Sequence, residues 1–449
     1  MRILFRTALF LLFTPLPAFA AEPAAKAPIA AETEPAPLPP PSLPVAVYLT
    51  WQRDPVTTMT VHWHTDWKNG FADSVLEYRS TRNGTDATWQ RAHGLAQQMP
   101  FTDRMVHTVE LTGLSGDTPY EFRFGRLTAR DPDGALLFNA YGTTHKFRTL
   151  PATLSRPVKF VSGGDIYGGA TTDLMANMCR AAARQDPDFA LLGGDIAYVN
   201  NEPKAAGRWF DFFNIWGETM VASDGRIIPI VTAIGNHEVH GDSYEIRGGA
   251  PARGVSPDRA LFFYTLFSFP GRPGYNALDF GNYLSVVALD SFHTNPVPGP
   301  QTDWLRETLA KRRNVPYVVP MYHVPAYPSY RPYAGAVSVA IRANWVPLFD
   351  EAGVRFVFEN HDHTYKVTHP LRSGEKHEAG TRYLGDGAWA VNTRTLPPID
   401  TRPYLSRAHE KNHVYVVTLN NDRADFSAID PTGTEFDQFT IKAGPAPKE

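Results

Sequence analysis

Gly193-Gly194-Asp195-Ile196-Ala197-Tyr198 follows the apolar run Phe189-Ala190-Leu191-Leu192. The apolar run predicts a buried strand, and the glycine pair ends it, so Asp195 is expected at the mouth of a sheet rather than inside it. Open α/β sheets bind ligands at this edge. Taken alone, Asp195 could be a metal ligand, a base or a turn residue, and a turn is the commonest setting for an aspartate beside glycine. The rest of the chain decides between these roles.

The composition limits the number of domains, the possible disulfides and the partners of the protein. The chain has 449 residues, a formal net charge of −3 and a single cysteine, Cys179. This length accommodates two or three domains with a sizeable core. A lone cysteine excludes an internal disulfide, so stability must come from core packing. The acidic balance argues against nucleic acid as a general partner.

The N-terminus has the features of a secretory signal peptide over residues 1–20, with a basic start, a short apolar region and the sequence Ala18-Phe19-Ala20. The apolar region is too short to span a membrane, and no later stretch reaches that length, so we expect no membrane span after signal cleavage. We therefore predict an exported protein, periplasmic or extracellular. Residues 21–44 are rich in Ala and Pro and predict an extended linker.

Residues 45–150 predict an all-β sandwich. Short runs of β-branched and aromatic residues, such as Val45 to Trp51 and Met59 to Thr65, are separated by turns rich in Gly, Asp and Asn. Tyr120 begins a strand after a turn, where its hydroxyl can bond the upstream backbone. This arrangement resembles the tyrosine corner of fibronectin type III domains.

From Arg156 onward predicted strands alternate with helical stretches as far as residue 435, which is the pattern of a sheet flanked by helices. Residues 436–449 are expected to form a C-terminal tail. The predicted strands are Val158 to Ser162, Asp188 to Leu192, Ile227 to Thr232, Tyr283 to Leu289, Pro316 to Pro320, Val354 to Phe358, Val414 to Leu419 and Arg423 to Ile429.

Five of these strands finish in polar residues of metal-binding type. Each group is a weak signal alone, but their recurrence in one structural context is strong. Two neighbouring cations need more carboxylate oxygens and imidazoles than one site does. Two metals about 3.5–4 Å apart clamp a phosphoryl group and lower the pKa of a bound water, so a hydrolytic site for phosphate esters is predicted. The groups are Gly163-Gly164-Asp165, Gly193-Gly194-Asp195, Gly235-Asn236-His237-Glu238, Met321-Tyr322-His323 and Glu359-Asn360-His361-Asp362-His363.

These motifs resemble those of the metallophosphoesterases, and within them the purple acid phosphatases. The feature typical of the purple enzymes is a tyrosine three residues after the bridging aspartate, here Tyr198 after Asp195. The resemblance implies an N-terminal fibronectin III-like all-β sandwich. It also implies a C-terminal α/β sandwich of the metallophosphoesterase type, a calcineurin-like catalytic domain, over residues 156–435.

The resemblance also implies the cofactors and the reaction. Fe(III) would be held by Asp165, Asp195, Tyr198 and His363. A divalent cation, Zn, Fe or Mn, would be held by Asp195, Asn236, His323 and His361, with Asp195 bridging the two metals. The protein would be a secreted acid phosphatase that hydrolyses small phosphate monoesters by attack of a metal-bound hydroxide.

The sequence departs from the family pattern at several places. The first motif has Tyr167 before its glycine and is one residue longer, and Asn360 replaces a glycine in the fifth. Plant-type members place proton-donating histidines after the lone metal-binding histidine, and here that stretch has none. His237 is therefore the best candidate for the general acid, and Arg331 and Tyr333 are candidate phosphate contacts.

Two other functions stay open. A phosphodiesterase or nucleotide hydrolase can use the same metal core, because the ligands do not distinguish one ester substituent from two. A non-catalytic surface-binding protein with a degenerate second domain is the third alternative. Such a protein would lack some of the metal ligands, and all seven are present here.

Overall fold

The structure is a computed structural model that describes residues 44–66, 74–84, 87–131, 133–134, 136–168, 171–239, 246–247, 250–251 and 256–444. The predicted signal peptide, 1–20, and linker residues 21–43 lie outside the described residues. Within the described ranges, no helix combines the length and apolar character needed to cross a bilayer.

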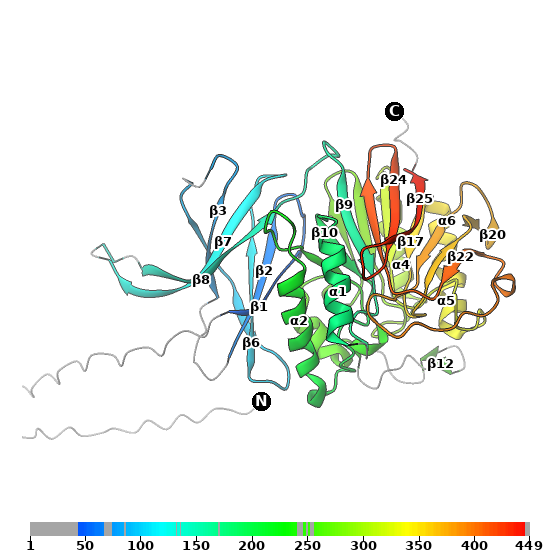
Figure 1. Ribbon diagram of the computed structural model, residues 1–449, viewed down its shortest axis with the longest axis horizontal. Coiled ribbons are helices and arrows are strands. Elements are labelled where there is room, and N and C mark those ends of the chain that lie inside the picture. The colour runs from blue at the N-terminus through cyan, green and yellow to red at the C-terminus, as the bar shows by residue number, and fades with distance from the viewer. Residues whose placement is uncertain are drawn as a thin grey trace, which may run out of the picture. The chain divides into compact units, whose positions relative to one another are not determined.

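The N-terminal region is a sandwich of two four-stranded antiparallel sheets (Figure 1). One sheet has the order β1 (Val45–Thr50), β2 (Met59–Asp66), β6 (Arg104–Leu111), β5 (Leu95–Gln98). The other has the order β4 (Gln90–His93), β3 (Val75–Ser80), β7 (Pro119–Arg130), β8 (Leu136–Arg148).

The predicted tyrosine corner is confirmed. The backbone N–H of Ser115 donates to the hydroxyl oxygen of Tyr120 at 2.8 Å. The ring of Tyr120 stacks on Phe147 with 5.1 Å between centroids, so the corner is anchored in the core between the two sheets.

The second region contains two mixed sheets that face each other. Phe160 of the first meets Phe358 of the second at 6.2 Å between ring centroids, and Phe426 meets Phe356 at 5.0 Å. The first has the order β11 (Ile230–Thr232), β10 (Phe189–Leu192), β9 (Val158–Gly163), β23 (Val414–Leu419), β24 (Arg423–Ile429), β25 (Glu435–Lys442). The second has the order β14 (Asn276–Phe280), β15 (Leu284–Ala288), β16 (Tyr317–Met321), β17 (Phe356–Phe358), β21 (Arg382–Gly385), β18 (Tyr365–Thr368), β22 (Leu405–His409).

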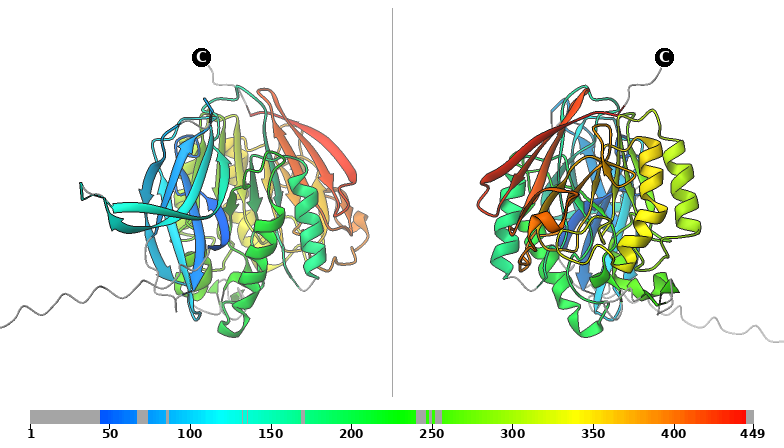
Figure 2. Two further views of the ribbon diagram at one scale, coloured as in Figure 1. Left: turned by 60° about the vertical axis from the view of Figure 1, so that its left-hand side comes forward. Right: turned by 90° about the vertical axis from the view of Figure 1, so that its right-hand side faces the viewer.

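Helices cover the outer faces of both sheets, which completes the predicted α/β sandwich (Figure 2). Met175, Cys179 and Trp209 pack on the outer face of the six-stranded sheet. Leu305, Ile341 and Phe349 belong to the core on the outer side of the seven-stranded sheet. The helices are α1 (Thr172–Ala183), α2 (Gly207–Thr219), α3 (Leu261–Leu266), α4 (Pro300–Ala310), α5 (Ala336–Asn344) and α6 (Val346–Ala352).

The remaining strands and helical turns are short. Two-stranded pairs form from β12 (Ile246–Arg247) with β13 (Ala250–Pro251) and from β19 (Leu371–Arg372) with β20 (Glu375–Lys376). Single 3₁₀ turns are η2 (Pro203–Ala205), η3 (Asn236–Glu238), η4 (Pro257–Ala260) and η5 (Ile399–Thr401).

The prediction of a tail over residues 436–449 is wrong for its first part. Glu435–Lys442 forms β25, an edge strand paired antiparallel with β24. Ile441 is its one fully buried side chain, and Phe439 stacks on Phe426 at 4.8 Å. An edge strand with one solvated face carries few apolar residues, so its signal in the sequence is weak. The second domain therefore extends beyond residue 435.

Candidate metal centre

All seven predicted ligands follow strand ends. Strands β9, β10 and β11 run parallel, and so do β16 and β17, so within each sheet their carboxyl ends meet at one edge. Asp165 follows β9, Asp195 and Tyr198 follow β10, Asn236 follows β11, His323 follows β16, and His361 and His363 follow β17.

The backbone at five of these positions is left-handed. The φ angles of Asp165, Asp195, Tyr198, His361 and His363 lie between 53° and 84°. Such a conformation costs a non-glycine residue about 1–3 kcal/mol, and it persists where surrounding contacts fix it.

A first group of ligand atoms forms around Asp165. Its Oδ1 lies 3.0 Å from the hydroxyl of Tyr198 and 2.9 Å from Nε2 of His363. The hydroxyl and this Nε2 are themselves 3.2 Å apart. Three ligand atoms at these mutual distances can bind a single cation, since metal–ligand bonds of about 2.0–2.2 Å put neighbouring ligand atoms at this spacing.

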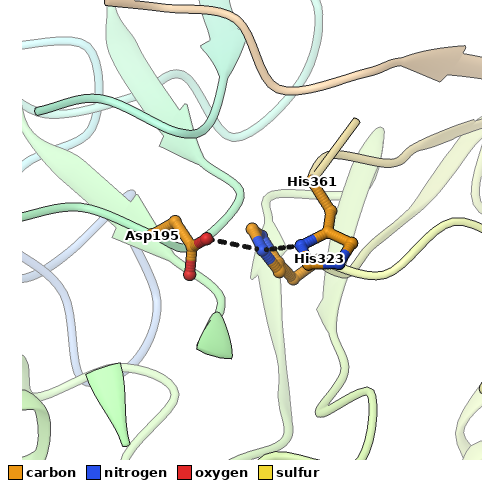
Figure 3. A group of neighbouring side chains, drawn as sticks. All are labelled: Asp195, His323 and His361. Atoms are coloured by element: carbon orange, nitrogen blue, oxygen red, sulfur yellow. Dashed lines mark hydrogen bonds and ion pairs between the residues drawn. The ribbon is translucent and has the colours of Figure 1, made fainter. Parts of the chain in front are cut away.

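A second group forms around His323. Its Nε2 lies 3.0 Å from Oδ2 of Asp195, 3.1 Å from Oδ1 of Asn236 and 3.0 Å from Nδ1 of His361. Figure 3 shows the ring of His323 between Asp195 and His361. Ligand atoms of these three residues all lie within 4.8 Å of one another, and all three side chains are buried.

In two of these histidines the other ring nitrogen contacts a backbone carbonyl, and these contacts show why a cation fits. Nδ1 of His323 is 2.9 Å from the carbonyl oxygen of Gly193, and Nδ1 of His363 is 3.3 Å from that of Asn392. A carbonyl only accepts, so each Nδ1 carries a proton and each Nε2 faces oxygen atoms. Whenever Nε2 is deprotonated, its lone pair and those of the oxygens repel one another unless a positive charge lies between them. The residues therefore fit a metal in both groups.

The pKa values of His323 and Asp195 in the second group also agree with a cation site. Burial alone would lower the pKa of His323, but the negative charges of Asp195 and Asp165 raise it to about 9. Burial would raise the pKa of Asp195, and the neighbouring His323 and His237 bring it below its usual range. The centre therefore attracts positive charge, either a proton or a metal ion.

Asp195 was predicted to bridge two metals. Its Oδ2 belongs to the second group, and its Oδ1 accepts the backbone N–H of His237 at 2.8 Å. The bridging role stays a prediction.

His237 was predicted as the general acid. Its ring stacks on Tyr198 with 4.0 Å between centroids, and its Nδ1 lies 2.6 Å from Oδ1 of Asn200. Its Nε2 lies 3.9 Å from Oδ2 of Asp195, and the side chain is 21% exposed. The ring is thus beside residues of both groups and is partly exposed to solvent.

Arg331 and Tyr333, the predicted phosphate contacts, lie in different surroundings. Arg331 donates from Nη1 to the carbonyl of His361 and pairs with Asp362, so it adjoins the centre. Tyr333 contacts Arg342, Tyr327 and Tyr404, none of them a predicted ligand.

Glu238 is a residue whose role the sequence reasoning missed. Its buried carboxylate accepts the backbone N–H groups of Asp195 at 2.7 Å, Ile196 at 2.8 Å and Gly235 at 2.8 Å. Burial and the charge of Asp195 raise its pKa to about 7. Glu238 fixes the turn that presents Asp195. Its place beside Asn236 and His237 was the available signal.

The departures from the family pattern also have structural reasons. Asn360 fills the space left by two glycines, since a Cβ would lie 2.5 Å from its Oδ1 at Gly164 and 1.9 Å from its Nδ2 at Gly193. A Cβ at Gly168 would lie 2.4 Å from Cζ of Tyr198, so the displaced glycine of the longer first loop makes room for that ring. Gly387 leaves room for Asp165, whose Oδ2 a Cβ would approach to 1.8 Å.

The fold and this paired centre define a metallophosphoesterase. Residues 158–365 match the calcineurin-like phosphoesterase family, and residues 44–149 match the family described as purple acid phosphatase, N-terminal domain. With both domains in this order, the chain belongs to the purple acid phosphatase family. That family uses a dinuclear metal centre.

Similar proteins include an uncharacterised protein of Mycobacterium tuberculosis, 28% identical over 385 residues, which covers 80% of this chain and 66% of the relative. Purple acid phosphatase 15 of Arabidopsis thaliana is 24% identical over 354 residues, covering 70% of this chain and 61% of the relative. The matched part is thus less than two thirds of the length of these relatives.

Solved structures share the fold. The purple acid phosphatase PPD1 from seeds of yellow lupin, Lupinus luteus, superposes with a TM-score of 0.70 at 16% identity, covering 89% of this chain and 74% of that one. PhoD gives a TM-score of 0.60 at 11% identity, covering 90% and 93%. The predicted fold class is confirmed.

Proposed function

We propose that the protein is an exported acid phosphatase that hydrolyses small phosphate monoesters at a binuclear metal centre. The observation that carries this proposal is the pair of ligand groups, in which each histidine that contacts a carbonyl turns its other nitrogen towards carboxylate or amide oxygens at 2.9–3.1 Å. A phosphate ester is the substrate that such a centre serves best, because two cations neutralise a phosphoryl group and activate a water.

The protein's own residues prepare the centre. Asp165, Tyr198 and His363 would hold Fe(III), while Asn236, His323 and His361 would hold the divalent cation, Zn, Fe or Mn, with Asp195 between them. The contact from Nδ1 of His237 to Asn200 orients the ring, with Nε2 towards the centre. His237 can therefore donate a proton to the departing alcohol oxygen.

The assignment is tested on the purified protein by metal analysis, a visible spectrum and two substrates. We expect two metals per chain, a visible absorption band, and faster hydrolysis of p-nitrophenyl phosphate than of bis(p-nitrophenyl) phosphate. Faster cleavage of the bis ester would instead establish the phosphodiesterase alternative. A protein that binds metal but cleaves neither ester would contradict the phosphatase assignment and favour a surface-binding role.

Two variants test the metal identity. Tyr198→Phe should lose the visible band, because the phenolate that binds iron is absent. Tyr78→Phe is the matched control, since Tyr78 lies in the sandwich on β3. A colourless, iron-free wild-type protein with full activity would refute the purple assignment.

Export rests on the sequence of residues 1–20. We expect the protein recovered from the periplasm or medium to begin at Ala21, which N-terminal sequencing would establish. Recovery of the full chain, retained in the cytoplasm, would contradict export.

A further inference from the structure

Three arginines meet around Tyr330, on the segment that follows His323. The guanidinium of Arg394 lies over the ring of Tyr330, 5.0 Å from its centroid. Nη2 of Arg402 donates to the carbonyl oxygens of Tyr330 and Arg331 at 3.1 and 3.0 Å. Tyr330, Arg331, Arg394 and Arg402 are called the arginine corner below.

The arginine corner adjoins the loop that carries two metal ligands. The backbone N–H of Arg394 donates to the carbonyl of His363 at 3.3 Å. Arg331 donates from Nη1 to the carbonyl of His361. Two of the three arginines thus bond the main chain of a ligand residue, and the corner forms one rim of the metal centre.

The corner carries excess positive charge. Asp362, which is fully buried, pairs with Arg331 at 2.9 Å and accepts the backbone N–H of Tyr330 at 2.8 Å. Among the described residues, neither Arg394 nor Arg402 forms an ion pair with a carboxylate. Asp362 is thus the carboxylate that forms an ion pair with these guanidinium groups within the described part of the protein, on a chain whose net charge is −3.

The chemistry of the corner suits an anion. A guanidinium presents a planar set of donors that matches phosphate oxygens, and stacking on an aromatic ring keeps those donors in plane and free at their edges. Tyr330 is 39% exposed and Arg394 is half-buried, so both side chains are accessible to solvent. A structural arginine would instead have its donors taken up by carboxylates or carbonyls, as Arg402 does with two carbonyls.

We propose that the arginine corner binds a second phosphate group of the substrate, so that the preferred substrates are phosphate monoesters that carry a further phosphate. The inference rests on the proposed function, because the first phosphate must bind at the metal centre. Arg394 supplies the direct contact, and Arg402 positions the segment of Tyr330 and Arg331.

The test compares fructose 1,6-bisphosphate with fructose 6-phosphate on the metal-loaded, full-length enzyme. We expect kcat/KM for the bisphosphate to exceed that for the monophosphate at least tenfold, mostly through KM. Equal values for the two sugars would overturn the proposal. Hydrolysis of neither sugar nor of p-nitrophenyl phosphate would instead contradict the proposed function.

Variants assign the effect to the corner. Arg394→Ala should lower the ratio of the two kcat/KM values about tenfold, and Arg394→Lys, which keeps the charge without the planar fork, should give an intermediate ratio. Arg306→Ala is the control, since Arg306 lies on α4 and pairs with Asp303 at the surface, and its ratio should match the wild type. An unchanged ratio in folded Arg394→Ala, checked by its melting curve, would overturn the role of Arg394. The wild-type comparison decides the proposal even if a variant fails to fold.

Discussion

The carboxamide of Asn360 lies against Gly193, so closely that a Cβ on the glycine would be 1.9 Å from Nδ2 of Asn360. The same Nδ2 donates to the carbonyl of Tyr322 at 3.1 Å, so the amide cannot swing away without losing a buried hydrogen bond. The two residues belong to facing sheets, and their contact joins the end of β10 to the end of β17.

Gly193→Ala should therefore destabilise the fold by about 2 kcal/mol or more and reduce metal content, because the new methyl group forces these strand ends apart. Gly207→Ala is the matched control, since no atom lies within 4 Å of a Cβ there and the residue begins α2. Urea unfolding and metal analysis measure both effects. The double variant Gly193→Ala with Asn360→Gly should regain part of the stability, and no recovery would show that another contact causes the loss.

Asp195→Asn should bring metal content below one ion per chain. An amide has the shape of the carboxylate but lacks its charge, and Asp195 is the anion that faces the second group. Metal analysis after dialysis measures the change, with Asp303→Asn on the surface of α4 as control. Retention of two metals would disprove the bridging role.

Lys366→Met should destabilise the protein by about 3–5 kcal/mol, because it leaves buried carboxylates without a counter-charge. Nζ of Lys366 is fully buried, 2.6 Å from Glu359 and 3.1 Å from Asp386. Chemical denaturation gives the free energy of unfolding, and Lys311→Met at the exposed end of α4 is the control. Adding Glu359→Gln should restore part of the loss; a further drop would mean that Glu359 stabilises the fold independently of Lys366.

The sandwich should lose stability in acid. Burial lowers the pKa of His62 to about 3 and that of His107 to about 4, whereas unfolded histidine titrates near 6.5. As the pH falls below 6.5, these histidines therefore bind protons in the unfolded chain but not in the folded chain. Above pH 6.5 the histidines do not reduce the free energy of unfolding. Below that pH the free energy of unfolding falls, by about 1–2 kcal/mol per histidine at pH 5, and it continues to fall towards pH 4.

Urea unfolding at pH 7 and pH 5 measures this loss. His107→Gln should reduce the difference between the two pH values, because glutamine stays neutral and can still contact Thr65 and Ser74, which lie 2.8 and 3.0 Å from the ring nitrogens of His107. His93→Gln, an exposed position on β4, should leave the difference unchanged. The same pH dependence in all three proteins would show that other groups cause it.

Strand ends could be predicted because the apolar run before Asp195 and the glycines after it act locally, within a few residues. The five polar groups then followed from the repetition of that local pattern. The sequence could not show that Asn360 fills the space beside Gly193, because this contact joins residues of two sheets. The edge strand β25 was missed for another reason, since pairing with β24 rather than apolar content defines it. The arginine corner likewise depends on three segments that meet only in the fold.

The carboxylate of Glu238 has a kinetic consequence. It holds the amide protons of Asp195, Ile196 and Gly235, and the residue is 2% exposed. An amide exchanges with solvent only when its hydrogen bond opens, so these protons should exchange as slowly as those of the central strands, although they lie in turns. The segment that begins as a glycine turn after β10 should thus open only when the whole domain unfolds.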